Sequence, residues 1–155
     1  MDKPIKRVEE LKPFSRDHHH TLLLCWKIKA GFKKNIPVNR IKAYSDWFFK
    51  NHIIGHFEME EEYLFPVLGR DHKLIQQAFE EHKKLTELFT DKTNIEESLN
   101  LIPELLESHI RFEERTLFNE IQKAASADQL EKFQHIHSDE KFTDNLSDEF
   151  WLYEK

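Results

Sequence analysis

The sequence contains two copies of one pattern, a histidine followed four and five residues later by glutamates and then by Leu-Phe. The first copy has His56, Glu60 and Glu61, and the second has His109 and Glu113 at an offset of 53 positions (109 − 56 and 113 − 60). Residues four apart lie on one face of an α-helix, so each copy directs an imidazole and a carboxylate at one point. Burying an ionised carboxylate costs several kcal/mol unless it is paired or binds metal. The repeat therefore favours a carboxylate-rich site for two metal ions.

Helices are the elements that must position these side chains. Only 3 glycines and 5 prolines occur, with 39% hydrophobic and 34% charged residues, which favours an all-α fold. Apolar residues at helical spacing, interrupted by breakers, predict the elements. They are expected to span about residues 14–34, 38–68, 71–89 and 95–123, with a short helix from about 126 and a tail that packs against them.

The expected helix ends follow from particular residues. Ser15 and Asp71 are the predicted caps of the first and third helices. Pro103 is expected to kink the fourth helix, whose ordered part would then begin near Asn100. The arrangement predicted is an up-down-up-down four-helix bundle. Residues 1–155 are interpreted as one domain, with the bundle over about 14–123 and the C-terminal helix and tail over 126–155.

Counting residues from the connecting loops predicts that each helix brings one histidine to the same level. His56 lies 12 residues before Leu68, and His82 lies 11 after Asp71 (68 − 56 and 82 − 71). On the first helix, His18 shares a face with buried-type residues and is preferred, while its neighbour His19 stays an alternative. The expected metal ligands are His18, His56, Glu60, His82, His109 and Glu113.

Other acids and histidines near these positions are expected to play lesser roles. Glu61 and Glu114 lie about 100° around the helix from the ligands and should face solvent or support the ligands, although Glu114 remains an alternative bridge to Glu113. Glu58 is a weaker candidate ligand for the same metal site. The residues interpreted as non-ligands are His52, His72, His135 and His137.

The overall charge and the apolar runs exclude several classes of protein. A net charge of −6, from 29 acids and 23 bases without a long like-charge block, argues against nucleic-acid binding. The sequence contains no run of about 18 apolar residues that could span a membrane. Its first residues lack the apolar stretch of a secretory signal. The single cysteine, Cys25, excludes an internal disulfide and is expected in the core. A cytoplasmic protein is predicted.

The ligand chemistry favours iron, with manganese as the alternative. Imidazole and bridging carboxylate suit these metals, whereas structural zinc prefers four ligands that usually include sulfur. Anionic bridges offset the repulsion of two neighbouring dications. Six protein ligands for two ions leave open positions for dioxygen, nitric oxide or peroxide. Phe57, Phe79 and Phe112 are expected to keep water scarce there. The E-x-x-H motif of ferritin-type centres is absent.

The segments HFEMEEEYLF, EHKKL and HIRFEERTLF, with a histidine after Ser-Arg-Asp, resemble the hemerythrin-like (HHE cation-binding) domain over about residues 14–121. The resemblance implies two iron ions bridged by two carboxylates and an oxo or hydroxo group. It makes Glu60 and Glu113 the bridges, with His18, His56, His82 and His109 as terminal ligands. The oxygen-carrying hemerythrins have H-x-x-x-H on the third helix, whereas Thr86 follows His82 here. The pattern is closer to the hemerythrin-like domain of iron–sulfur-cluster repair proteins.

The function expected from the sequence is therefore binding or sensing of a small diatomic ligand, dioxygen or nitric oxide, at a carboxylate-bridged di-iron centre. Two alternatives stay open. One is a redox enzyme that acts on oxygen, peroxide or nitric oxide with an unknown electron-transfer partner. The other is a protein of iron handling or iron–sulfur-cluster repair.

Overall fold

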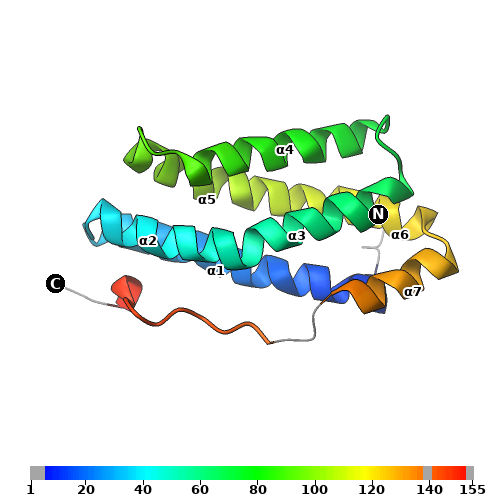
Figure 1. Ribbon diagram of the computed structural model, residues 1–155, viewed down its shortest axis with the longest axis horizontal. Helices are drawn as coiled ribbons and strands as arrows, with labels where there is room; N and C mark the ends of the chain where they lie inside the picture. Colours follow the sequence, from blue (N-terminus) through cyan, green and yellow to red (C-terminus); the bar gives the residue numbers. More distant parts are fainter. Residues whose placement is uncertain (1–5, 138–140, 153–155) are drawn as a thin grey trace, which may run out of the picture.

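The computed structural model describes residues 6–137 and 141–152, and within these ranges the regular structure is helical, without strands. Four long rods run side by side and antiparallel (Figure 1). The first rod is α1 (Lys12–Lys33), and the third is α4 (Lys73–Thr90). The second rod continues from α2 (Val38–Phe48) through α3 (Ile54–Met59) to Val67, and the fourth joins α5 (Ile95–Phe112) to α6 (Phe118–Ala124). The predicted all-α four-helix bundle is confirmed, followed by the short α7 (Ala127–Ile136).

The first rod begins earlier than predicted. α1 starts at Lys12, with Pro13 in its first turn, so Ser15 lies inside the helix and is not its cap. Proline is tolerated there because the first backbone N–H groups of a helix have no partner within it. The Ser15 hydroxyl instead donates to the Glu114 carboxylate at 2.9 Å. The rod ends before Asn35, whose φ of 59° is a left-handed conformation that asparagine adopts more readily than most residues.

The predictions for the ends of the third and fourth rods also need correction. His72, and not Asp71, caps α4, because its Nδ1 accepts a hydrogen bond from the Leu74 backbone N–H at 3.1 Å. α5 runs unbroken from Ile95 through Pro103, so the expected start near Asn100 was wrong. Burial of apolar side chains on both sides of the proline stabilises the helix there and offsets the backbone hydrogen bond that proline cannot make.

Both copies of the sequence repeat form the same unusual backbone. The chain widens into π-helical turns at Glu60–Leu64 and Glu113–Leu117, and a further π turn spans Phe49–Ile53. Single π turns inside α-helices often mark functional sites. Each repeat thus places its glutamate at the first residue of a widened turn, so the repetition extends from the sequence to the local geometry.

The core consists of two apolar clusters, one toward each end of the bundle. One includes Leu24, Phe48, Leu85 and Leu106, and the other includes residues such as Phe14, Leu64, Ile75 and Leu117. On every rod the predicted metal ligand lies between residues of the first cluster and residues of the second. The polar site is therefore enclosed by hydrocarbon along the bundle axis.

The C-terminal segment, residues 141–152, runs back along α1 and α2 (Figure 1). Asp144 accepts hydrogen bonds from the buried Lys27 ammonium and from the Tyr44 hydroxyl. Farther along, Phe150 packs against Gly31, where a Cβ atom would lie only 2.8 Å from the Phe150 ring. The predicted packing of the tail is confirmed for Phe150 and Trp151, both buried, but not for Leu152, which is exposed. Tyr153 lies outside the described residues.

We expect Asp144→Asn to destabilise the protein by about 3 kcal/mol, because removing one partner of a buried ion pair leaves the Lys27 charge uncompensated. Burial raises the pKa of the Asp144 carboxyl, but the hydrogen bonds from Lys27 and Tyr44 outweigh this effect and lower it overall. Urea unfolding at neutral pH would measure the change. Asp148→Asn, which breaks a more exposed pair with Arg40, should cost less than about 1 kcal/mol. If both variants lost the same free energy of unfolding, the pair of Asp144 with Lys27 would not stabilise the protein more than the exposed pair does.

Candidate metal centre

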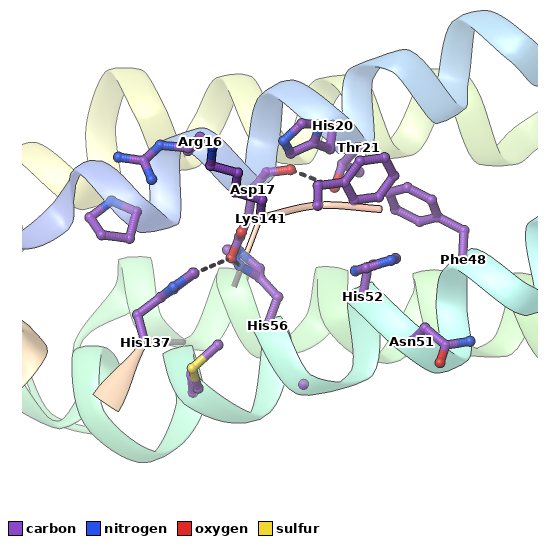
Figure 2. Close-up of a pocket in the computed structure, with 14 residues that line it drawn as sticks. Arg16, Asp17, His20, Thr21, Phe48, Asn51, His52, His56, His137 and Lys141 are labelled. Atoms are coloured by element: carbon purple, nitrogen blue, oxygen red, sulfur yellow. Dashed lines mark hydrogen bonds and ion pairs between the residues drawn. The ribbon is translucent and has the colours of Figure 1, made fainter. Parts of the chain in front are cut away.

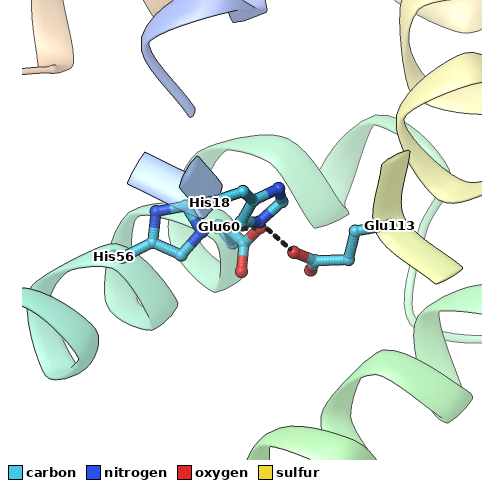
Figure 3. Close-up of side chains that lie close together, drawn as sticks. All are labelled: His18, His56, Glu60 and Glu113. Atoms are coloured by element: carbon cyan, nitrogen blue, oxygen red, sulfur yellow. Dashed lines mark hydrogen bonds and ion pairs between the residues drawn. The ribbon is translucent and has the colours of Figure 1, made fainter. Parts of the chain in front are cut away.

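The structure brings all six predicted ligands together at the middle of the bundle. They form two groups of buried side chains whose ligand atoms lie within 4.8 Å of one another. One group holds His18, His56, Glu60 and Glu113, as Figure 3 shows, and the other holds Glu60, His82, His109 and Glu113. The two groups share both glutamates. This sharing suggests a site for two metal ions, and ligation by each of the six residues stays a prediction.

Apart from His18 Nε2, which contacts Glu113 Oε1 at 2.9 Å, the inner atoms of this site lack the hydrogen-bond partners that buried polar groups normally have. Glu60 and Glu113 are both 0% exposed. The buried atoms without a hydrogen bond include Nε2 of His56, His82 and His109, both carboxylate oxygens of Glu60 and Oε2 of Glu113. These imidazoles and carboxylates approach to 3.1–3.3 Å without the geometry of a hydrogen bond. Atoms of these types that converge unpaired fit the donor set of a metal centre.

The pKa shifts in the site indicate which positive charges balance the buried carboxylates when no metal is bound. Burial lowers the pKa of His56, but Glu60 and the hydrogen bond to Asp17 outweigh that effect and raise it to about 10. For His109, burial is likewise outweighed by Glu113, and the pKa rises to about 9. Burial alone would raise the pKa of Glu113, yet the surrounding histidines hold it well below its usual range. The site therefore needs positive charge, which protonated imidazoles or metal ions can supply.

A ring of four outer carboxylates orients the four histidines. Each one contacts the Nδ1 atom of a histidine on the neighbouring rod, which leaves Nε2 directed inward. The pairs are Asp17 with His56 at 2.9 Å, Glu61 with His82 at 2.7 Å, Glu81 with His109 at 2.7 Å, and Glu114 with His18 at 2.8 Å. Carboxylates that hold the outer nitrogen fix the tautomer and orientation of metal-binding histidines and make them better ligands.

The ring follows from a simple rule in the sequence. Each outer carboxylate is the immediate neighbour of an inner ligand on its own rod: Asp17 precedes His18, and Glu61 follows Glu60. Glu81 with His82 and Glu114 with Glu113 repeat the relation. Adjacent residues of a helix point about 100° apart, so one reaches the centre while the other reaches the next rod. The sequence left Glu61 and Glu114 as either solvent-facing or supporting residues, with Glu114 also an alternative bridge, and it missed Asp17 and Glu81.

We expect Glu81→Gln to weaken metal binding by about 10- to 100-fold, the usual effect of removing a partner that orients a metal-binding histidine. Competition with a chelator of known affinity would measure this loss. The matched control is Glu80→Gln, since Glu80 is the exposed neighbour on the same helix. If both variants bound metal as tightly as the natural protein, Glu81 would have no role in the site.

Aromatic rings shield the histidines from water. Phe57 stacks on His82 with 3.7 Å between ring centroids, which confirms its predicted proximity. Phe118 stacks on His18 at 5.3 Å, a contact that the sequence did not reveal. Phe112 lies farther away, 6.4 Å from His109, and Phe79 packs on Phe65 in the apolar cluster. The first two rings therefore provide most of the stacking against the ligands.

The structure also separates the alternatives that the sequence left open. His19 and Glu58 are exposed, so neither joins the centre. The predicted non-ligands His52, His72, His135 and His137 lie outside both ligand groups. Glu113, and not Glu114, is shared between the groups, while Glu114 faces the outer nitrogen of His18.

A buried His/Glu centre inside an antiparallel four-helix bundle defines the class of carboxylate-rich helical metal-binding domains. The chain belongs to the hemerythrin HHE cation-binding domain family, whose model matches residues 10–121. The resemblance inferred from the two repeats is thus confirmed. Comparison with curated proteins and with solved structures gave no significant match.

Among the helices of residues 6–137 and 141–152, we find none with both the length and the apolar character needed to cross a lipid bilayer.

Proposed function

We propose that this protein holds two iron ions between Glu60 and Glu113 and binds or senses a small diatomic ligand, dioxygen or nitric oxide. Iron in such a site supplies open coordination positions with the electron density that these gases require. Glu60 and Glu113 would partly offset the charge of the two cations, and the four histidines would complete the ligand set. The outer carboxylates hold each imidazole with Nδ1 turned away from the centre.

The observation that carries the proposal is a small cavity beside the histidines. It is lined by His18, His56 and His109 together with hydrocarbon side chains, including Ile53, Leu106 and Ile110. Its volume of about 10 Å³ is about the least that a water-sized molecule needs. A space of this size admits at most a very small ligand and excludes an organic substrate. The apolar wall also offers few hydrogen bonds to a competing water molecule.

The first test measures iron per chain and then the visible spectrum under argon, dioxygen and nitric oxide. We expect two irons and bands that change reversibly with the gas. Leu106→Phe should fill the cavity and reduce the gas response while it preserves the iron content, because Leu106 lines the cavity and is not a ligand. Leu101→Phe, on the exposed side of the same helix, is the control. The proposal would be contradicted if the purified protein contained no iron, or if Leu106→Phe left the gas response unchanged.

The same samples distinguish the two alternative functions. Steady consumption of oxygen, peroxide or nitric oxide with an added electron donor would favour a redox enzyme. Rapid transfer of iron to a chelator or to an apo-protein acceptor would favour iron handling. Manganese in place of iron in the purified protein would change the metal assignment while leaving the ligand assignment intact.

A further inference from the structure

A second cavity, distinct from the small one at the centre, opens between α1 and the second rod and is also lined by His137, Lys141 and Phe142. Its volume is about 430 Å³, within the usual range for sites that bind small organic molecules. Figure 2 shows His56, Asp17 and His137 together in this cavity, with Phe48 and Asn51 toward its other end. The proposed gas site does not use this space.

The charged groups around this cavity favour an anion. Arg16 and Lys141 line it, and no ion pair joins either of them to an acid among the described residues. Asp17 is the one acid among the described residues that line the cavity, and that carboxylate already contacts His56 and His137. An excess of cations at a cavity is notable in a chain with a net charge of −6, and it attracts anionic ligands.

The rest of the cavity wall suits a flat or hydrocarbon group of a ligand. Phe48, Met59 and Phe142 contribute apolar surface, and Phe142 stacks on His20 with 4.2 Å between ring centroids. Gly55 also lines the cavity, and a Cβ atom placed there would meet nothing within 4 Å. The absence of a side chain at Gly55 thus leaves open space where a larger residue would fill the cavity.

We propose that this cavity binds a small organic carboxylate, with its carboxylate group near Arg16 and Lys141 and its hydrocarbon part against Phe48, Met59 and Phe142. The inference rests on three observations: two cations that pair with no acid among the described residues, an aromatic wall, and open space at Gly55.

Occupancy of the cavity is transmitted to the metal centre through Asp17. A single oxygen of that residue, Oδ2, contacts both His56 Nδ1 at 2.9 Å and His137 Nε2 at 2.7 Å. A ligand that shifts Asp17 must therefore change the support of His56. This transmission depends on the proposed metal function, whereas binding of the carboxylate does not, so the two can fail separately.

Benzoate is the probe, with benzyl alcohol as the neutral molecule of similar shape and inorganic phosphate as the anion without a hydrocarbon body. Chemical-shift changes in the ¹⁵N-labelled full chain, prepared with metal and after chelation, would be followed up to about 10 mM, ten times a Kd of about 1 mM. We expect saturable binding of benzoate to both preparations. Benzyl alcohol and phosphate should each bind at least about tenfold more weakly.

Two variants test the location of the site. Arg16→Ala/Lys141→Ala should weaken benzoate binding by about tenfold or more, whereas Lys84→Ala/Lys92→Ala removes the same charge from exposed positions elsewhere and should have no effect. Gly55→Leu keeps both cations but fills the open space, so it should abolish binding. Leucine favours a helix more than glycine does, so this variant is expected to fold, and circular dichroism would confirm that.

Each outcome supports or overturns the proposal. Saturable benzoate binding that Gly55→Leu abolishes supports it. No saturation up to about 10 mM, or binding that Gly55→Leu leaves unchanged, overturns it. If benzyl alcohol binds as tightly as benzoate, the cations do not recognise the carboxylate group. If phosphate binds as tightly as benzoate, the hydrocarbon part of the ligand contributes nothing. If benzoate binds but leaves the visible spectrum of the metal-loaded protein unchanged, the transmission through Asp17 is wrong.

Discussion

Glu113→Gln should empty both metal positions at once. Glu113 is shared by the two ligand groups and is 0% exposed, and glutamine preserves its shape while it removes the charge. A neutral amide cannot offset the repulsion between two cations a few ångströms apart. Metal analysis of the purified variant should therefore show almost none of the metal that the natural protein binds, with the helical circular dichroism spectrum retained.

The matched controls separate this effect from a general loss of charge. Glu107→Gln changes a partly exposed glutamate on the same rod, which pairs with Lys29, and should leave the metal content unchanged. His56→Ala removes a ligand of one group alone, so metal should remain bound by the other group. A Glu113→Gln variant that kept its full metal content would refute the shared-bridge assignment.

Removal of metal should make the stability of the protein strongly dependent on pH. Without metal, the charge of the two buried glutamates is balanced by protonated histidines, because the pKa of His56 rises to about 10 and that of His109 to about 9. A histidine whose pKa is raised by folding contributes stability that is fully present below its unfolded value, 6.5, and is lost as pH rises through the folded value. The chelated protein should therefore lose several kcal/mol of unfolding free energy between about pH 6.5 and 10.

The metal-loaded protein supplies the control for this experiment. Bound cations replace the protons, and metal binding to neutral imidazoles strengthens as protons leave. Its stability should therefore not fall over the same range. Thermal unfolding at a series of pH values, with and without chelator, would measure both curves. Parallel curves for the two forms would show that the histidines do not balance these carboxylates.

The sequence predicted the bundle and the location of the centre because each depends on a periodic signal. The spacing of His56 and Glu60 places both side chains on one helix face, and the offset of 53 duplicates that face on another rod. Counting from the loops placed His82 level with His56, and the structure brings both into one centre with Glu60 between them.

Other features could not be predicted because they depend on contacts between rods. Asp17 and Glu81 appear in the sequence as ordinary charges on a solvated helix face, and their role depends on the rotation of the neighbouring rod. The π turns were not predicted either, because a single wider turn changes the spacing of the apolar residues by only about one position. The start of α1 at Lys12 and the passage of α5 through Pro103 reflect tertiary packing, which outweighed the local signals at Ser15 and Asn100.

The outer carboxylates have a consequence for how the centre can change over time. Every rod carries at least one of the six inner side chains. Each rod also carries one outer carboxylate that contacts the histidine of the next rod, and the four contacts form a closed ring. A one-residue insertion within any rod would turn both groups away together, by about 100°. An insertion within a rod therefore disturbs its contacts with both neighbouring rods, whereas loops tolerate insertions, so changes of length should accumulate in the loops.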